Sequence, residues 1–202
     1  MARQERGETF SVFDGIGSAP KGMQAAQAMC DILIKFYQEP ERYQASASGI
    51  LKLLLEGNET IYNWGFISNT DRPLGGCAGT VVWLYEDSLS VFHAGDTAAL
   101  LIRDGETSQI TQPHNMDDGA IYRYFSLGPN LAIETNQIPL EEFDRILLLS
   151  DGVTKAFRPI EAGNLVEGYN DISQTARVLG QRSQTIGSTD DITVLLIEIK
   201  KP

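Results

Sequence analysis

The sequence predicts an α+β fold in which antiparallel β-sheets pack together and helices lie outside them. The prediction rests on the order of the elements: a strand, two helices, several antiparallel strands, a helix and a closing strand. At 202 residues the chain is long enough to bury a substantial core, and no linker or repeat divides it. We therefore expect a single domain over residues 1–202.

The N-terminal third is predicted to hold one strand and two helices. Residues 8–13 form an apolar segment of strand length, and helical spacing follows over residues 21–37. Pro40 ends this helix, and a second helix is expected from about 41 to 62, weakened in its middle by Gly57. The expected apolar faces are Met23, Ala26, Cys30, Leu33 and Tyr37 in the first helix, and Ala47, Ile50, Leu51, Leu54, Leu55, Ile61 and Tyr62 in the second.

The remainder of the chain is dominated by strands. Residues 86–88 are a turn of hairpin size, Asp104-Gly105 is typical of a type I′ turn, and residues 112–120 indicate a polar loop. The expected strands are 80–85, 89–94, 97–103, 121–125, 131–138, 144–150 and 192–199, with one helix at 171–185.

Composition excludes several classes of function. The net charge is −11 and lysine and arginine form no cluster, which argues against nucleic acid as a partner. The longest apolar segments have strand length, so we expect no membrane span, and the first residues do not resemble a signal peptide. Cys30 and Cys77 lack metal-type spacing, and free thiols in a reducing compartment indicate a cytoplasmic protein.

Aspartates at strand ends are the most informative feature of the sequence. Asp14-Gly15 and Asp151-Gly152 each follow an apolar strand, and Asp190-Asp191 stands directly before the last strand. Hard divalent cations prefer oxygen ligands at fixed positions, and glycine allows the backbone to come close. One such step alone is typical of a turn, but the set predicts a carboxylate-lined metal site of the kind that hydrolyses phosphate esters.

These steps belong to an ordered set of motifs that spans most of the chain. The sequence resembles the metal-dependent serine/threonine protein phosphatases of type 2C, and within them the small bacterial branch that resembles stage II sporulation protein E and the stressosome phosphatases. The matching segments are 13–17 (FDGIG), 79–82 (GTVV), 94–97 (AGDT), 126–128 (SLG), 149–153 (LSDGV) and 190–194 (DDITV).

This resemblance implies a central β-sandwich flanked by helices, with a two-metal site for Mn²⁺ or Mg²⁺ at one end. By position, Asp14 would bridge both metals and the Gly15 carbonyl would face one of them. Asp151 and Asp190 would complete the other metal, and Asp96 would help Asp151 to hold an accessory third one. The implied reaction is attack of metal-activated water on phosphoserine or phosphothreonine in a phosphoprotein, without a phosphoenzyme, in bacterial stress or sporulation-type signalling. The sequence leaves the oligomeric state open.

The chain also departs from the family pattern. The family opens with an acidic strand before the first Asp-Gly, but only thirteen residues precede Asp14 and none matches, so this first strand is expected to be missing. Glu5 or Glu8 remains as a candidate substitute, and a pseudophosphatase that binds a partner with little turnover remains the alternative function. A haloacid-dehalogenase reading fails because it needs an aspartate where Val12 stands.

A few polar residues near these motifs carry two interpretations. The family pattern favours Asp190 over Asp191 as the metal ligand. His93 is expected to be a packed histidine and His114 a structural one, whereas Lys21 is a solvated lysine or, less favoured, a phosphate contact.

Overall fold

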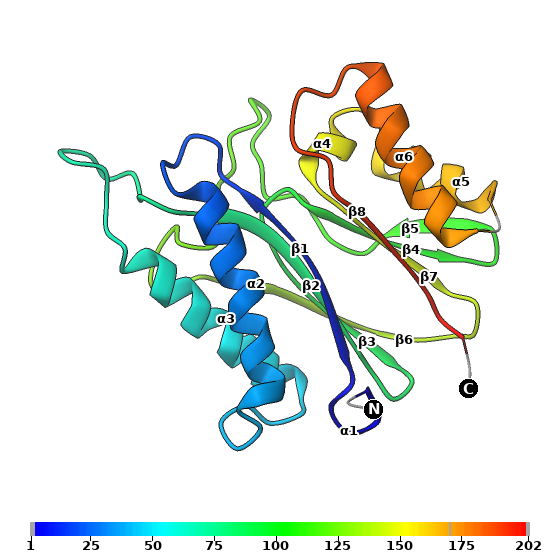
Figure 1. The fold of residues 1–202 in the computed structure, drawn as a ribbon, viewed down its shortest axis with the longest axis horizontal. Coiled ribbons are helices and arrows are strands. Elements are labelled where there is room, and N and C mark those ends of the chain that lie inside the picture. Colours follow the sequence, from blue (N-terminus) through cyan, green and yellow to red (C-terminus); the bar gives the residue numbers. More distant parts are fainter. Residues whose placement is uncertain (1–2, 170, 201–202) are drawn as a thin grey trace.

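The computed structural model describes residues 3–169 and 171–200, which form two stacked antiparallel sheets with helices on both outer faces (Figure 1). The first sheet has the strand order β1-β2-β3-β6, and the second has the order β5-β4-β7-β8. The strands of the first are β1 (Glu8–Gly15), β2 (Cys77–Tyr85), β3 (Ser88–Ala94) and β6 (Glu134–Pro139). Those of the second are β4 (Ala98–Arg103), β5 (Glu106–Gln109), β7 (Arg145–Leu149) and β8 (Val194–Glu198). The predicted sandwich is confirmed.

The helices divide between the two outer faces. Two long helices, α2 (Gly22–Gln38) and α3 (Ala47–Tyr62), pack on the first sheet. On the second sheet lie α4 (Asp151–Thr154), α5 (Pro159–Glu167) and α6 (Ile172–Ile186). A short helix, α1 (Arg3–Arg6), precedes β1. None of the helices in the described part of the chain is long and apolar enough to cross a membrane.

Strand β2 shows how the sequence builds these layers. Side chains alternate between the faces of a strand, so a strand that is covered on both sides is apolar throughout. Val81 and Trp83 point into the core shared with α2 and α3, whereas Val82 and Leu84 pack between the two sheets. A separate cluster joins β4 and β7 to the C-terminal helices.

Several predicted boundaries are wrong. The second helix begins at Ala47 and not near Glu41, because the Ser46 side chain accepts a hydrogen bond from the Gly49 amide and caps the helix there. Residues 121–125 form only isolated bridges, and α4 and α5 were not predicted. The buried face of α2 is Ala25, Met29, Ile32, Leu33 and Phe36.

The predicted face of α2 was displaced because apolar residues nearly surround this helix. Met23, which was expected inside, is 78% exposed. The Asp104-Gly105 turn, by contrast, is confirmed: both residues have positive φ, at 51° and 81°, as a type I′ turn requires.

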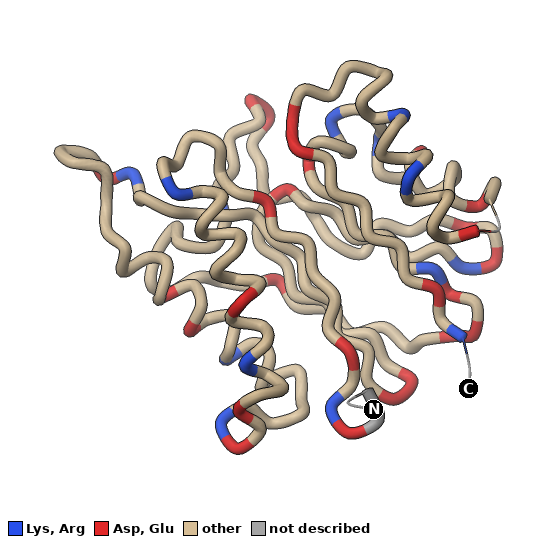
Figure 2. Tube along the Cα trace, viewed as in Figure 1, with Lys and Arg blue, Asp and Glu red and all other residues tan. Residues whose placement is uncertain are grey.

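The register of the sheets brings the acidic steps to one end of the sandwich. Leu149, the last residue of β7, pairs with Ala98 at the start of β4 and with Val194 at the start of β8. The segments that hold Asp96, Asp151 and Asp190 therefore leave the second sheet together. In Figure 2 acidic positions lie along this end of both sheets, and lysine and arginine form no stripe on the trace.

Strand β1 forms an edge of the first sheet, because it pairs only with β2. Among the described residues no strand precedes it.

Candidate metal centre

Asp14 and Asp151 meet at the end of the sandwich where β1 and β7 terminate. Asp14 Oδ2 and Asp151 Oδ1 are buried, and within the described residues neither has a hydrogen-bond partner. Burial, then the proximity and charge of the Asp151 carboxyl group, then the charges of Asp190 and Asp96 raise the pKa of Asp14 to about 8. Two carboxylates this close share a proton or need a cation between them.

Asp96 joins the same group of charges. Its pKa is raised to about 6, first by burial and then by the charge of Asp151. A cavity of about 230 Å³ is lined by both Asp96 and Asp151, so the two carboxylates face common space. The structure thus brings together Asp14, Asp96, Asp151 and Asp190, four of the five predicted positions.

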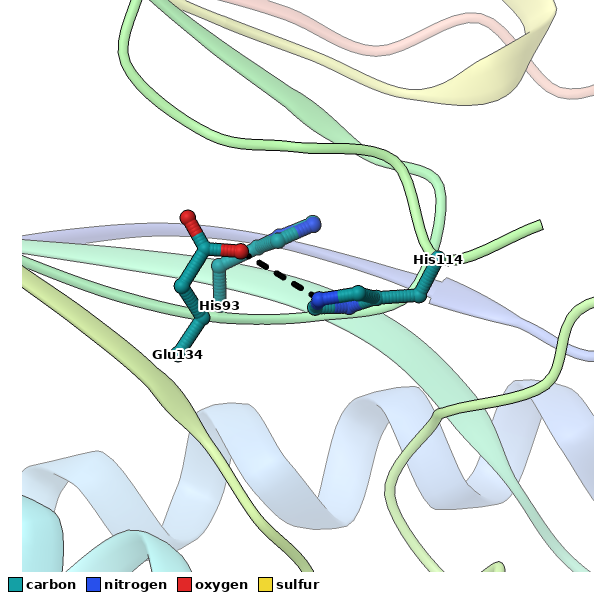
Figure 3. Close-up of side chains that lie close together, drawn as sticks. All are labelled: His93, His114 and Glu134. Carbon is teal, nitrogen blue, oxygen red and sulfur yellow. Dashed lines mark ion pairs between the residues drawn. The ribbon is translucent and has the colours of Figure 1, made fainter.

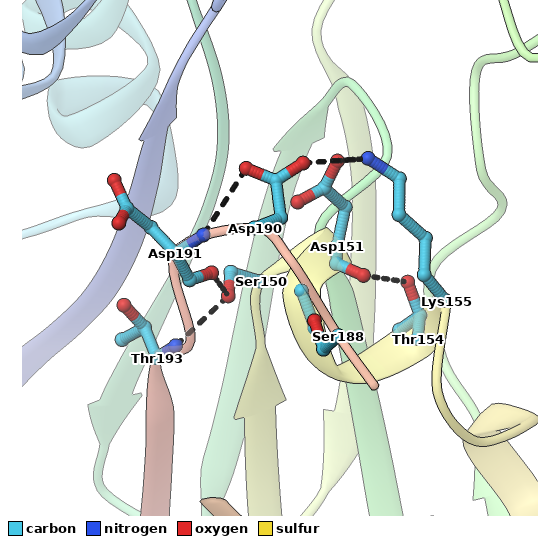
Figure 4. Close-up of polar contacts among 9 residues, drawn as sticks. Ser150, Asp151, Thr154, Lys155, Ser188, Asp190, Asp191 and Thr193 are labelled. Carbon is cyan, nitrogen blue, oxygen red and sulfur yellow. Dashed lines mark hydrogen bonds and ion pairs between the residues drawn. The ribbon is translucent and has the colours of Figure 1, made fainter. Parts of the chain in front are cut away.

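Asp190 and Asp191 are separated by the direction of their side chains. The Asp190 carboxylate points toward Asp151 and lies 2.8 Å from the Lys155 ammonium, whereas Asp191 points away from both (Figure 4). The hydrogen bond from Lys155 is the main cause of the lowered pKa of Asp190. This arrangement supports the choice of Asp190 over Asp191.

Hydrogen bonds hold the Asp190 segment against the start of α4. Ser150 Oγ donates to the Asp191 carbonyl and accepts from the Thr193 amide, both at 2.9 Å (Figure 4). Ser188 Oγ donates to the Gly152 carbonyl at 2.6 Å. A Cβ on Gly152 would lie 2.3 Å from the Asp191 carbonyl oxygen, so glycine is required here for the close approach of two chain segments.

Close packing of the backbone also requires glycine at position 15. A Cβ at this position would lie 2.7 Å from the Gly22 carbonyl oxygen at the start of α2. The glycine therefore allows β1 to pass directly under that helix. Packing alone accounts for it, and the carbonyl contact with a metal remains a prediction.

Neither glutamate proposed as a substitute ligand lies near the centre. Glu8 pairs with Leu84 at the opposite end of β1 from Asp14. A strand rises about 3.3 Å per residue, so their Cα atoms are roughly 20 Å apart. Glu5 lies before Glu8 in α1, which excludes it as well. Lys21 is directed to the Trp64 ring, with its ammonium 5.9 Å from the ring centroid.

His93, His114 and Glu134 form a second polar cluster, between β3, the loop that follows β5, and β6 (Figure 3). Their nitrogen and oxygen atoms lie within 4.8 Å of one another, close enough to suggest a metal. Each ring nitrogen nevertheless has a partner. His93 contacts Thr80 Oγ1 and the Gln112 carbonyl, at 2.9 and 3.0 Å, and the rings of His93 and His114 stack.

His114 connects this cluster to the loop of Asp96. Its Nδ1 accepts from the Gly95 amide at 3.1 Å, its own amide donates to the Gly95 carbonyl at 2.7 Å, and Nε2 lies 3.2 Å from a Glu134 carboxylate oxygen. The residue next to Asp96 is thus clamped from both sides. The packed His93 and the structural His114 agree with the expectation from sequence, whereas Glu134 was not anticipated.

Both histidines should make the protein sensitive to acid. Burial, and then the neighbouring His114, lower the pKa of His93 to about 4, while an unfolded histidine titrates near 6.5. Between these values the unfolded chain binds more protons, so stability is present above about pH 6.5 and is lost as the pH falls toward 4. Glutamine cannot titrate, so between pH 6.5 and pH 5 the free energy of unfolding of His93→Gln should fall by about 1.5 kcal/mol less than that of the wild type, measured by urea unfolding. Equal losses in the two proteins would contradict this.

The carboxylates of the acidic centre are better neutralised by a hard divalent cation than by protons shared among them. Its carboxylates offer oxygen donors, two of them buried and without a partner in the described part of the chain, and their charges repel one another. Oxygen donors favour Mg²⁺ or Mn²⁺ over zinc. The residues that could hold the ion are Asp14, Asp151 and Asp190, with Asp96 beside them.

Comparison with known proteins gives a consistent result. A family model described as protein phosphatase 2C matches residues 1–185. The serine/threonine phosphatase stp of Listeria monocytogenes is 22% identical over 211 residues, which cover 93% of this chain and 82% of that protein.

Solved structures share the fold. The Mycobacterium tuberculosis serine/threonine phosphatase PstP/Ppp superposes with a TM-score of 0.82 at 20% identity, over 96% of this chain and 88% of that one. The catalytic domain of PstP in complex with two manganese ions has a TM-score of 0.81 at 21% identity, with the same coverage.

Proposed function

This chain belongs to the protein phosphatase 2C family, and from that premise we propose that it hydrolyses phosphoserine and phosphothreonine in phosphoproteins with Mn²⁺ or Mg²⁺. The observation that supports it most is the pair of buried carboxylate oxygens of Asp14 and Asp151, which have no hydrogen-bond partner among the described residues and lie beside Asp190 and Asp96. The names of its relatives and the manganese in a structural neighbour support the same activity.

The residues of the chain have separate tasks in this reaction. Asp14, Asp151 and Asp190 would hold the metal, with the Gly15 carbonyl as a further ligand and Asp96 at an accessory position. A divalent ion bound there lowers the pKa of bound water and neutralises charge on a phosphoryl group. Ser150 and Ser188 keep the Asp190 segment in place, and His114 keeps Gly95, and so Asp96, in place.

We also propose a narrower class of physiological substrate. The resemblance to the sporulation and stressosome branch supports a phosphoprotein of a bacterial stress or sporulation-type circuit. The free cysteines, Cys30 and Cys77, agree with a reducing cytoplasm.

One observation favours a second function, a pseudophosphatase that binds a phosphoprotein with little turnover. Strand β1 lies at the edge of its sheet, and Glu8 lies far from Asp14, so in the described part of the chain Glu8 does not replace the acidic ligand of the family's first strand. We expect one well-held cation and a second that binds only at higher concentration, because Mg²⁺ relies on few carboxylates and each matters.

Turnover of a phosphothreonine peptide decides between the two functions. Hydrolysis should require added Mn²⁺ or Mg²⁺ and should stop with EDTA, and calorimetry with Mn²⁺ should resolve one tight and one weaker site. Peptide binding without release of phosphate at any metal concentration would establish the pseudophosphatase instead.

A further inference from the structure

Lys155 places a positive charge in the acidic centre. Its ammonium lies 2.6 Å from Asp151 Oδ2 and 2.8 Å from Asp190 Oδ2, so one cation bridges both carboxylates (Figure 4). Lys155 directly follows α4 and stands four residues after Asp151, which puts both side chains on one side of that turn. Within residues 3–169 and 171–200, no other lysine or arginine forms an ion pair with Asp14, Asp96, Asp151 or Asp190.

The contacted carboxylates are the ones a metal would need. Asp151 offers Oδ2 to the ammonium, while its Oδ1 and Asp14 Oδ2 remain buried without partners. A divalent ion held by these carboxylates and an ammonium paired with the same carboxylates would lie close together and repel each other. The two cations therefore compete for Asp151 and Asp190.

We propose that Lys155 is the resident counter-ion of the metal-free centre, which a divalent cation must displace in order to bind. Lys155 stabilises the metal-free fold and weakens the affinity for the metal. The proposal rests on the metal use in the proposed function, but it does not depend on turnover.

The position of Lys155 allows such an exchange. Its side chain is 58% exposed, so the ammonium can leave the carboxylates by rotation of its own side chain without a rearrangement of the core. It also lines the cavity that contains Asp96 and Asp151, so a positive charge stays near the centre after displacement. Partly exposed ion pairs are weak, and two of them correspond to about a 3- to 30-fold change in affinity.

The central test is Lys155→Met, which keeps the length of the side chain and removes its charge. Calorimetry should show Mn²⁺ and Mg²⁺ binding about 3- to 30-fold more tightly than in the wild type. The melting temperature of the metal-free variant should fall, whereas that of the Mn²⁺-saturated variant should match the wild type. Lys35→Met, on the exposed surface of α2, is the matched control and should change none of these values.

A second measurement follows the displacement itself. In the wild type, the ε-methylene NMR signal of Lys155, assigned from its absence in Lys155→Met, should shift on titration with Mg²⁺ over the range in which heat is released. A signal that stays unchanged to saturation, or a variant that binds Mn²⁺ no more tightly, would overturn the proposal.

Failure of the proposed function is distinguishable from failure of this inference. A wild type that binds Mn²⁺ but releases no phosphate would remove the activity and leave the competition intact. A wild type that binds no Mn²⁺ would overturn both.

Discussion

Asp14→Asn is expected to lower metal-dependent phosphate release by about 100-fold or more. Asp14 lies close to the other carboxylates of the centre, since the charges of Asp151, Asp190 and Asp96 all contribute to its raised pKa. Asparagine keeps the size of the side chain but carries no negative charge, so the affinity for a divalent cation falls sharply. The measurement is steady-state hydrolysis of a phosphothreonine peptide at saturating Mn²⁺.

The matched control is Asp191→Asn, because Asp191 is an aspartate next to Asp190 whose side chain points away from Asp151 and Lys155 (Figure 4). It should keep most of the activity, while Asp190→Asn should follow Asp14→Asn. The metal-free Asp14→Asn protein should melt higher than the wild type near pH 7, because Asp14 takes up a proton on folding that the unfolded chain has released, and asparagine carries no such cost. If Asp191→Asn lost as much activity as Asp190→Asn, the assignment of the ligand would be wrong.

The sequence was sufficient to predict the sandwich and the convergence of the acidic steps. Both depend on local signals: apolar runs of strand length, and an aspartate placed directly at a strand end, as at Asp14 and Asp151. The pairing of Leu149 with Ala98 and Val194 then fixes which strand ends meet. Asp151 and Asp190 meet because β7 and β8 are neighbours in the second sheet, and Asp14 joins them because β1, in the first sheet, ends at the same end of the sandwich.

Features that depend on packing were harder to predict. Apolar residues occur almost all around α2, so the sequence did not identify its buried face, and Met23 proved to be exposed. In the sequence, Gly152 was interpreted as a residue that lets the backbone approach a metal. The structure also requires glycine there because the Asp191 carbonyl lies close to it. Such contacts join segments far apart in the chain, and no local pattern records them.

Only one of the two contacts of Lys155 could have been predicted from the sequence. Its spacing of four residues from Asp151 was visible in the sequence and would have indicated a pair on one helical turn. Nothing in the sequence placed Asp190 on the other side of the same ammonium. The short helix α4, which brings Lys155 into position, was itself not predicted.

Saturating Mn²⁺ is expected to raise the melting temperature of the protein by about 5–10 °C at one hundred times the dissociation constant. The ion binds the folded protein and replaces the mutual repulsion of the buried carboxylates with attraction. Differential scanning calorimetry with and without Mn²⁺ measures the shift, and EDTA should reverse it. The Asp14→Asn variant should show a much smaller shift.

The same repulsion gives the metal-free protein a dependence on pH. The pKa of Asp14 is about 8 in the folded protein and near 3.8 when unfolded, so between these values the folded state holds a proton that the unfolded chain has lost. Stability therefore falls as the pH rises, and above about pH 6.5 the histidines no longer oppose this trend. We expect a loss of about 1 kcal/mol between pH 6.5 and 8 once solvent screening is allowed for, measured by urea unfolding. With Mn²⁺ bound the carboxylate is already deprotonated, so this loss of stability should disappear. A metal-free protein that is as stable at pH 8 as at pH 6.5 would show that the pKa of Asp14 is not raised in the folded state.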